Sequence, residues 1–517
     1  MSVQLDLSRQ LVLGEVLARW ARKNPDREAL VFKDKRYTYS QFNERVNRLA
    51  HGLTGLGIEK GDKVAVLFMN CTEIAECYFA LAKLGAVTVP LNFRLAGREL
   101  QYQIDQSDSK AFIFGEMFQE LVSSIRPQLP KVKLYICVSE KGIEGTIDYE
   151  KLVQEGSTAE PLVPVEDDDP AFIMYTAGTT GRPKGAVLTH KNQIMLAANS
   201  SIERGAGLIG KQLLVFPLFH QAATGFVIIG VFLGATTVIL DVPTPENIMA
   251  AIQEEKIQSV GLVPALWNWI VNHPNFKDYD LSSLEQGTTG AAPMPLELKR
   301  KIVELLPNMR LSEAFGMTET TASGTIAGHE DFLAKQGTVG KITINIEARV
   351  VDDNDSDVTI GEVGEIVYRG PAVMKEYYKM PEATAEAFKG SWFHSGDLVR
   401  QDEDGFIYVV DRKKDMIISG GENIYPAEIE EVLYTHPKVL EAAVIGVPDP
   451  DWGESVKAIV VPKQGETLTD EEVIEHCKKN LASYKKPKSV EFIDALPRNP
   501  TGKVLKFVLR EKYGKVE

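Results

Sequence analysis

A glycine-rich stretch that contains one lysine is the part of the sequence best suited to chemistry. Residues 175–185 read Tyr-Thr-Ala-Gly-Thr-Thr-Gly-Arg-Pro-Lys-Gly. The glycines let the backbone turn sharply and approach a ligand, the threonines offer hydroxyl donors, and Lys184 adds a compact positive charge. Because these groups suit phosphate, the stretch predicts a phosphate-binding loop. The alternative is a solvated surface turn, since Gly, Thr and Pro are ordinary turn residues.

The residues that flank this loop predict that it connects two strands. Residues 171–174 and 186–188 are short apolar runs typical of buried strands. A Walker A loop needs Gly-x-x-x-x-Gly-Lys-Ser/Thr at the start of a helix, whereas Lys184 is followed by glycine and apolar residues. Residues 205–210 match the dinucleotide fingerprint Gly-x-Gly-x-x-Gly, but a helical pattern precedes them and a strand follows. That order is the reverse of what the fingerprint requires, so we reject it.

Three later stretches carry groups suited to a planar ligand with hydroxyls. Residues 287–293 predict a glycine-rich turn whose small side chains let such a ligand lie against the backbone. Residues 312–319 combine an aromatic ring, a hydroxyl and a carboxylate, and residues 392–397 end on an acid at a glycine turn, suited to accept paired hydroxyl donors. His220 ends a strand beside an apolar helix, and is either a core histidine or part of a substrate pocket.

Composition limits the protein class. The chain has 517 residues, which suggests two or three domains, and its 44% hydrophobic and 25% charged residues are typical of soluble globular proteins. A net charge of −15 argues against sequence-independent binding to nucleic acid or to an anionic membrane. The cysteines have no CxxC spacing and predict reduced core thiols: Cys71, Cys77, Cys137 and Cys477.

The sequence predicts a cytoplasmic protein without a membrane span. Residues 1–20 lack the apolar region of a signal peptide. Residues 221–240 carry no charge and are nearly long enough to cross a bilayer, but they contain glycines, threonines and a glutamine. A buried helix up to Gly234, followed by a buried strand, is the better interpretation.

Hydrophobic periodicity predicts an α/β fold with two domains. Thr38 and Gln41 have the spacing of a capping box, and residues 64–90 read strand, helix, strand, which is a βαβ unit with parallel strands. We expect a large N-terminal domain of β-sheets flanked by helices over residues 1–411. The charged break at 412–415 marks the start of a compact α+β domain over residues 412–517.

Six separated stretches together resemble one family, the adenylate-forming enzymes, which include acyl-CoA synthetases, amino-acid adenylation domains and firefly luciferase. The stretches occur in the family's order, at residues 175–185, 290–293, 315–319, 392–397, 411–423 and 497–503. The resemblance covers essentially the whole chain and implies that the small C-terminal domain is mobile. Residues 419–423, Ser-Gly-Gly-Glu-Asn, resemble the acyl-CoA synthetase branch, the fatty-acid and aryl-acid CoA ligases.

The resemblance implies a role for each matching residue. The ATP phosphates would be held by Thr176, Gly178, Thr179, Thr180, Gly181 and Lys184. The adenine slot would consist of Gly290, Ala291, Ala292, Pro293, Glu313, Ala314, Phe315 and Gly316, with Phe315 stacking on the base. Many relatives have Tyr at this last position, and Phe315 keeps the stacking face while it lacks the hydroxyl.

Further roles concern catalysis, the sugar, the acid and coenzyme A. Thr318 would contact the α-phosphate, Glu319 would ligate Mg²⁺, and Asp397 and Arg412 would take the ribose hydroxyls. Lys503 would be the mobile catalytic lysine of the C-terminal domain, acting with Lys184. The remaining expected residues are the acyl-pocket residues His220, Gln221 and Thr224, the hinge Lys414, and the coenzyme A residues Gly420 and Gly421. The alternative for Lys414 is a solvated charge in a linker.

These residues predict an ATP-dependent acyl-CoA synthetase. The enzyme would activate a medium-chain, long-chain or arylalkyl carboxylic acid as acyl-AMP, release pyrophosphate and transfer the acyl group to coenzyme A. An amino-acid substrate is disfavoured because residues 219–223 contain no acid to bind an amine. The alternatives are a ligase that loads a carrier protein and a non-catalytic ATP-binding sensor. The sequence leaves the oligomeric state open.

Overall fold

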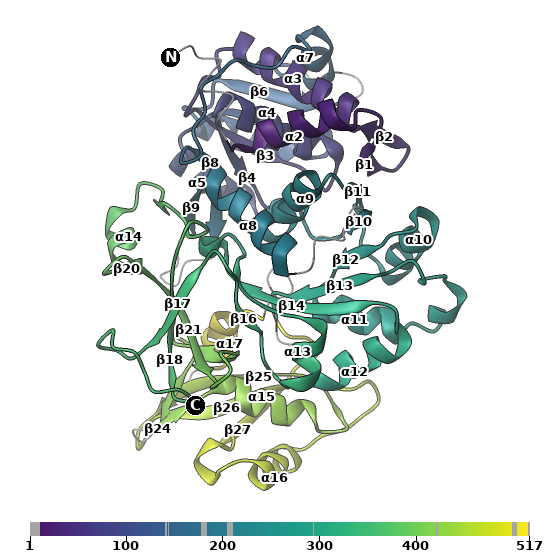
Figure 1. Cartoon of the computed structure of the whole chain (residues 1–517). Coiled ribbons are helices and arrows are strands. Elements are labelled where there is room, and N and C mark those ends of the chain that lie inside the picture. The colour runs from purple at the N-terminus through teal and green to yellow at the C-terminus, as the bar shows by residue number, and fades with distance from the viewer. Residues whose placement is uncertain are drawn as a thin grey trace.

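The computed structural model describes residues 11–139, 142, 144–176, 183–203, 210–292, 294–419, 422–498 and 504–514. These residues form four β-sheets with helices on their faces (Figure 1). Three sheets build a large N-terminal domain, and the fourth builds a smaller C-terminal domain at the bottom of the view in Figure 1. The predicted fold class, α/β with a large and a small domain, is confirmed.

The first sheet has eight strands and is buried on both faces. In spatial order its strands are β19 (Glu376–Tyr377), β9 (Lys184–Thr189), β8 (Pro170–Thr176), β4 (Val87–Pro90), β3 (Lys63–Leu67), β5 (Ser109–Gly115), β6 (Leu134–Val138) and β7 (Ile147–Asp148). β3 and β4 pair in parallel across α4 (Thr72–Leu84), which confirms the predicted βαβ unit. Successive strand side chains point to opposite faces, and Val64 and Val66 pack into one core while Ala65 and Leu67 pack into another.

Helices cover the two faces of this sheet. One face packs against α2 (Leu13–Lys23), α3 (Tyr39–Gly55), α4 and α7 (Tyr149–Glu155). The other packs against α5 (Gly97–Gln106), η1 (Glu116–Phe118), α6 (Gln119–Ile125) and η2 (Arg126–Gln128). The predicted capping box is present at the start of α3, where Thr38 accepts from Gln41 N–H and Gln41 accepts from Thr38 N–H.

The second sheet has nine strands and lies beside the first. Its order is β16 (Lys341–Ile342), β15 (Gly324–Ala327), β14 (Arg310–Gly316), β13 (Gln286–Gly290), β12 (Ser259–Gly261), β10 (Lys211–Leu214), β11 (Thr236–Ile239), β1 (Glu28–Phe32) and β2 (Lys35–Thr38). The strands from β14 to β1 are parallel, and the associated helices are α8 (His190–Glu203), α9 (Gln221–Leu233), α10 (Pro245–Glu255), α11 (Pro264–Val271), η3 (Phe276–Asp278), α12 (Leu296–Leu305), η4 (Thr318–Thr320) and α13 (His329–Ala334).

Two of the sequence predictions concern segments of this sheet and its helices. The apolar segment 221–240 consists of a buried helix, α9, which is capped at its end by Gly234, and of strand β11 after it, as expected. The glycine-rich turn predicted at 287–293 is wrong over its first half, because residues 287–290 belong to β13. The side chains of Met309 and Trp267 fill the space beside Gly287, so a small residue is needed there for packing and not for turning.

The third sheet is antiparallel. It contains β17 (Glu347–Val351), β18 (Val363–Arg369), β21 (Trp392–Gln401) and β20 (Phe388–Lys389), with β22 (Ile407–Arg412) paired to β21 and α14 (Pro381–Ala387) nearby in the chain. The glycine turn predicted at 392–397 is a β-bulge within β21, because Glu365 pairs with Leu398 and Val367 pairs with His394. Gly396 has φ +70°, so the extra backbone is accommodated by a left-handed residue inside a continuous strand.

The fourth sheet forms the core of the C-terminal domain. It contains β24 (Glu422–Ile424), β23 (Ile417–Ser419), β26 (Gly453–Pro462) and β25 (Val439–Asp449), with β27 (Ser489–Phe492) paired to β26. α15 (Pro426–Tyr434) and α16 (Asp470–Asn480) cover one face, α17 (Lys506–Tyr513) covers the other, and η5 (Ser483–Lys485) precedes β27. The turn 413–415 connects this domain to β22, and a domain boundary at 411/412 stays a prediction.

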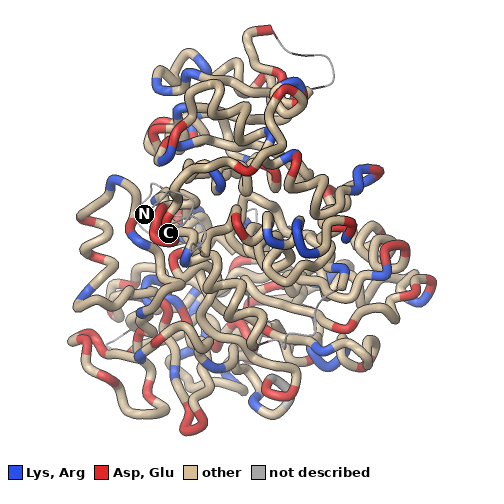
Figure 2. Tube along the Cα trace, turned by 45° about the horizontal axis from the view of Figure 1, so that its top comes forward, with Lys and Arg blue, Asp and Glu red and all other residues tan. Residues whose placement is uncertain are grey.

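Charge and thiol patterns agree with the composition. Acidic and basic residues are interspersed along the chain in Figure 2. All four cysteines are free thiols, three of them buried. Among the described residues, no helix is both long enough and apolar enough to cross a bilayer.

Candidate active site

A β-hairpin presents the two ends of the predicted phosphate loop. β8 and β9 are antiparallel neighbours, and Thr176 lies opposite Lys184 in their register. The expected strand, loop, strand order is therefore confirmed for the flanking strands. The loop residues Gly178, Thr179, Thr180 and Gly181 lie outside the described residues.

Glu319 meets this hairpin from the other sheet. It sits in η4, just after the end of β14, and is only 6% exposed. Its Oε1 accepts hydrogen bonds from Thr176 Oγ1 at 3.1 Å and from the Tyr377 hydroxyl at 2.9 Å. Its backbone carbonyl accepts from Met374 N–H at 2.7 Å, which fixes η4 against the segment before β19. The two large sheets thus bring Thr176 and Glu319 together.

Tyr377 is a site residue that sequence reasoning missed. Strand β19 pairs with β9 and places Tyr377 opposite Ala186. Lys184 Nζ lies 5.0 Å from the centre of the Tyr377 ring, a cation–π contact. Burial, and then the Glu319 charge, raise the pKa of the Tyr377 hydroxyl, so it remains a donor. A lone tyrosine in a two-residue strand has no local signal, because its position depends on long-range pairing.

The Glu319 carboxylate fits one protein ligand of a divalent cation. Both donors that reach it from the described residues bind Oε1, and no described cation forms an ion pair with it. A buried carboxylate with a second oxygen left over suits Mg²⁺, which prefers hard oxygen ligands and keeps most of its coordination for phosphate and water. The described residues contain no cluster of three His, Cys, Asp or Glu side chains that could hold a metal unaided.

The residues predicted to form the adenine slot lie at the ends of β13 and β14, and their role toward adenine stays a prediction. Gly290 pairs with Ala314, and a Cβ on Gly290 would lie 2.5 Å from the Ala314 carbonyl oxygen, so only glycine fits. Ala291, Thr321 and Ala322 have φ values of +67°, +54° and +55°. Such strained backbone persists where the surroundings impose it, often at functional sites. Pro293 lies outside the described residues.

Glu313 is engaged inside the protein. Its carboxylate forms a buried ion pair with Lys299 of α12, and both side chains are nearly inaccessible to solvent. Burial raises the pKa of Glu313, and the Lys299 charge offsets part of that rise. The pair fixes α12 to β14 and so supports the neighbouring Ala314, Phe315 and Gly316. Lys299 is a second residue that the sequence pattern did not reveal.

The predicted ribose residues lie side by side. Asp397 and Arg412 are opposite each other in the β21/β22 pair, and Arg412 Nε is 2.5 Å from Asp397 Oδ1. Asp397 is 3% exposed, whereas Arg412 is half-buried. This pair confirms that the two residues are neighbours, while their role toward ribose stays a prediction.

The expected acyl-pocket residues surround the start of α9. His220 precedes the helix, and burial lowers its pKa to about 4, so it is neutral at pH 7. Gln221 and Gln193 exchange side-chain hydrogen bonds of 3.0 Å, and Thr224 Oγ1 donates to the Leu218 carbonyl at 3.0 Å. Gln221 is therefore bonded to α8, and Thr224 to the backbone just before α9.

The remaining predicted site residues belong to the C-terminal domain, beginning with the hinge candidate Lys414. Lys414 is exposed in the turn 413–415, while Gly420, Gly421 and Lys503 lie outside the described residues. Next to this predicted hinge, Asp415 forms an ion pair of 2.8 Å with Arg510 of α17. α17 is therefore linked to the C-terminal side of the turn 413–415.

Two family models match the chain. The model for AMP-binding enzymes matches residues 17–378, and the model for the C-terminal domain of AMP-binding enzymes matches residues 428–503. The chain belongs to the AMP-binding enzyme family.

Curated AMP-binding enzymes resemble the chain over its whole length. A long-chain-fatty-acid–CoA ligase of Mycobacterium tuberculosis is 39% identical and covers 97% of this chain and 98% of its own. A feruloyl-CoA synthase of Amycolatopsis is also 39% identical, with 97% and 99% covered. The solved o-succinylbenzoate coenzyme A synthetase of Bacillus subtilis, in complex with ATP and magnesium ion, is 30% identical, has a TM-score of 0.85 and covers 96% and 99%.

These similarities confirm the predicted class. The resemblance to adenylate-forming enzymes, the acyl- or aryl-CoA ligase activity, and the use of ATP, Mg²⁺ and coenzyme A by enzymes of this kind are all borne out at the level of the family. Relatives that are CoA ligases do not favour a carrier-protein ligase or an ATP sensor.

Proposed function

We propose that this chain is an AMP-forming acyl-CoA synthetase that acts on an apolar monocarboxylic acid of medium-chain, long-chain or arylalkyl type. The observation that carries the substrate class is the uncharged wall around α9. Residues 213–240 contain no Asp, Glu, Lys or Arg, and α9 is almost entirely buried. The one titratable side chain in that wall, His220, is neutral at pH 7.

In the first half-reaction a carboxylate oxygen of the acid attacks the α-phosphorus of ATP. The bond to the bridging oxygen of pyrophosphate breaks, and acyl-AMP and pyrophosphate result. Bringing two anions together needs positive charge, which Lys184 beside the Tyr377 ring and Lys503 of the C-terminal domain would supply. Mg²⁺, held by Glu319, would neutralise charge on the phosphate oxygens. Thr176 and Tyr377 orient the Glu319 carboxylate through their hydroxyls.

In the second half-reaction the thiol sulfur of coenzyme A attacks the acyl carbonyl carbon. The bond from that carbon to the phosphate oxygen of AMP breaks, the thiol proton is lost to solvent, and the thioester and AMP leave. AMP is a good leaving group, so this step depends on positioning more than on a strong base. Gly420 and Gly421 would border the path of the pantetheine arm.

The neutral wall argues against a second carboxylate on the substrate. A carboxylate that loses its hydration against this segment would meet no cation from it, at a cost of at least about 3 kcal/mol, or roughly 100-fold in kcat/KM. Two relatives at 39% identity are named for a fatty acid and for an aromatic monocarboxylic acid, and these support the proposal without choosing between the two types. The solved relative at 30% identity is named for o-succinylbenzoate, which has two carboxylates, so the proposal follows the neutral wall and the more similar relatives.

The experiment measures ATP–pyrophosphate exchange and acyl-CoA formation with a panel of acids. Octanoate, decanoate and 3-phenylpropanoate should give kcat/KM values at least about 100-fold above malonate and succinate. Control reactions lack coenzyme A, so that adenylation and thioester formation are scored separately. A short dicarboxylate that outperforms octanoate would refute the proposed substrate class.

A further inference from the structure

One buried carboxylate, Glu365, holds the backbone beside both predicted ribose residues. It lies on β18 and is only 7% exposed. Its Oε1 accepts from Gly396 N–H at 2.9 Å, directly before Asp397. Its Oε2 lies 3.2 Å from Lys413 Nζ, directly after Arg412. A single side chain therefore contacts a chain neighbour of each member of the Asp397–Arg412 pair.

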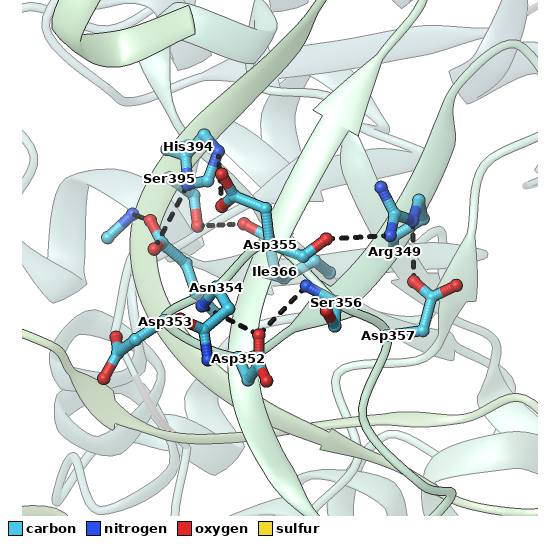
Figure 3. A network of polar contacts seen from close by, with 12 residues as sticks. Arg349, Asp352, Asp353, Asn354, Asp355, Ser356, Asp357, Ile366, His394 and Ser395 are labelled. Carbon is cyan, nitrogen blue, oxygen red and sulfur yellow. Dashed lines mark hydrogen bonds and ion pairs between the residues drawn. The ribbon is translucent and has the colours of Figure 1, made fainter. Parts of the chain in front are cut away.

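The bulge that carries Asp397 is held against β18 by further bonds. Ser395 Oγ donates to the Ile366 carbonyl at 2.5 Å (Figure 3). The same oxygen accepts from Asp397 N–H at 3.0 Å. The Gly396 carbonyl accepts from Lys413 N–H at 2.9 Å. Since Gly396 has a left-handed φ, the bulge depends on these contacts to keep one geometry.

Glu365 also faces a histidine, whose outer partner is exposed. His394 Nδ1 is 3.3 Å from Glu365 Oε2, and His394 Nε2 is 3.5 Å from Asp355 Oδ1 (Figure 3). Burial alone would raise the pKa of Glu365, but the Gly396 N–H bond and the nearby His394 and Lys413 lower it below its ordinary value. Glu365 is therefore ionised at neutral pH.

We propose that Glu365 is a positioning residue for nucleotide ribose, which aligns the Asp397–Arg412 pair by holding Gly396 on one side and Lys413 on the other. The inference rests on the proposed function, in which that pair receives the ribose hydroxyls. Glu365 itself touches neither the nucleotide nor the reacting atoms. Its two carboxylate oxygens have separate contacts, since Oε1 accepts from Gly396 N–H in the bulge and Oε2 lies beside Lys413 and the His394 ring.

The test compares ATP with 2′,3′-dideoxy-ATP as the substrate for adenylation of octanoate. Two well-aligned hydroxyl bonds to a charged group should give the wild type a kcat/KM preference for ATP of about 100-fold. Glu365→Ala should reduce this preference to below about 10-fold, because the bulge loses its acceptor and Asp397 shifts. Glu365→Gln should be intermediate, since the amide oxygen still accepts from Gly396 N–H.

Two reference variants complete the experiment. Asp355→Asn removes only the charge of the outer partner of His394, and Asn tolerates the φ of +61° at this position, so the preference should stay at the wild-type value. Asp397→Ala defines the preference that remains without the pair. A general loss of stability lowers kcat/KM for both nucleotides alike and leaves their ratio unchanged, so the ratio reports positioning. If Glu365→Ala does not fold, the Glu365→Gln ratio decides.

The outcomes separate the two levels of inference. A wild-type preference of about 100-fold that survives in Glu365→Ala and Glu365→Gln overturns the positioning role. A wild-type preference near one shows that Asp397 and Arg412 do not receive the ribose hydroxyls, which overturns that part of the proposed function and the inference with it. A drop in Asp355→Asn equal to that in Glu365→Ala would assign the effect to the loop of residues 352–357 and not to Glu365.

Discussion

At the scale of single residues, the candidate site is a set of hydroxyls and rings arranged around one carboxylate. Thr176 and Tyr377 both donate to the same oxygen of Glu319, and the Tyr377 ring lies beside Lys184. The two hydroxyl donors orient the carboxylate and bring no positive charge to it. The arrangement would leave a hard oxygen ligand for a cation beside the same tyrosine that contacts Lys184, the residue proposed to meet phosphate.

Replacing Glu319 with Gln should slow adenylation far more than it weakens ATP binding. The amide keeps an oxygen for the Thr176 and Tyr377 hydroxyls but loses the charge that would hold Mg²⁺, an ion that would act on charge developing in the transition state. We expect kcat for ATP–pyrophosphate exchange to fall about 100- to 1,000-fold, with the Kd for ATP changed less than about 5-fold. An unchanged kcat with a raised KM for ATP would give Glu319 a binding role instead.

At the scale of elements, two helices are linked through a buried histidine. His190 at the start of α8 is fully buried, and its Nδ1 accepts from Leu13 N–H at the start of α2 at 3.4 Å. Burial lowers the pKa of His190 to about 4, although the Asp169 charge acts to raise it and Lys60 to lower it. A neutral ring is needed, because a protonated Nδ1 cannot accept the Leu13 bond.

This histidine predicts a loss of stability in acid. The folded pKa of about 4 lies below the unfolded value near 6.5, so the unfolded state binds more protons between these values and stability falls as pH drops through that window. At pH 5 the contribution of His190 to this loss is about 2 kcal/mol. Urea unfolding at pH 7.5 and 5.0 should show a smaller pH difference in His190→Asn, by about that amount.

Only the pH difference decides that test, since the substitution also changes packing. The Asn Oδ1 retains an acceptor toward Leu13 N–H and does not titrate. His220, whose pKa is also lowered to about 4, remains in both proteins and contributes equally to each. An identical pH difference in wild type and variant would mean that His190 is already protonated, or exposed, in the folded protein.

At the scale of the whole molecule, the C-terminal domain is joined to the large domain at the turn 413–415. Asp415 pairs with Arg510, and Lys506 pairs with Glu430, so α17, α15 and the far side of the turn are linked to one another. Across the turn, Asp411 Oδ2 accepts from Ala427 N–H at the start of α15 at 3.0 Å. A rotation at Lys414 would carry α17 and the preceding Lys503 with the domain and break this last bond.

Mutations in the C-terminal domain should separate the two half-reactions. Lys503→Ala should abolish acyl-AMP formation yet leave conversion of supplied acyl-AMP and coenzyme A to thioester. Lys414→Pro should do the reverse, because proline fixes φ and would restrict the proposed swing that would bring Gly420 and Gly421 to the site. Single-turnover assays of each step measure both effects.

Lys414→Ala is the matched control for that pair, because it removes the charge and leaves φ free. If it equals Lys414→Pro, charge and not backbone rotation explains the effect. Equal losses in both steps for Lys503→Ala and Lys414→Pro would mean that the two reactions use one domain arrangement.

Local patterns in the sequence determined the elements and the order of the motifs. The capping box at Thr38, the βαβ unit over residues 63–90 and the end of α9 before Gly234 depend on neighbours a few residues apart, and all three form as predicted. Tertiary structure decided the rest. Residues 287–290 belong to strand β13 and residues 395–397 to a bulge, although the sequence predicted turns at both places. Pairing with distant strands gives their backbone groups hydrogen bonds that a turn would leave unmade. Long-range contacts also explain why three residues at or beside the site were not predicted: Tyr377, Lys299 and Glu365. Each bonds to a partner between 14 and 58 residues away, and hydrophobic periodicity carries no information over that distance along the chain.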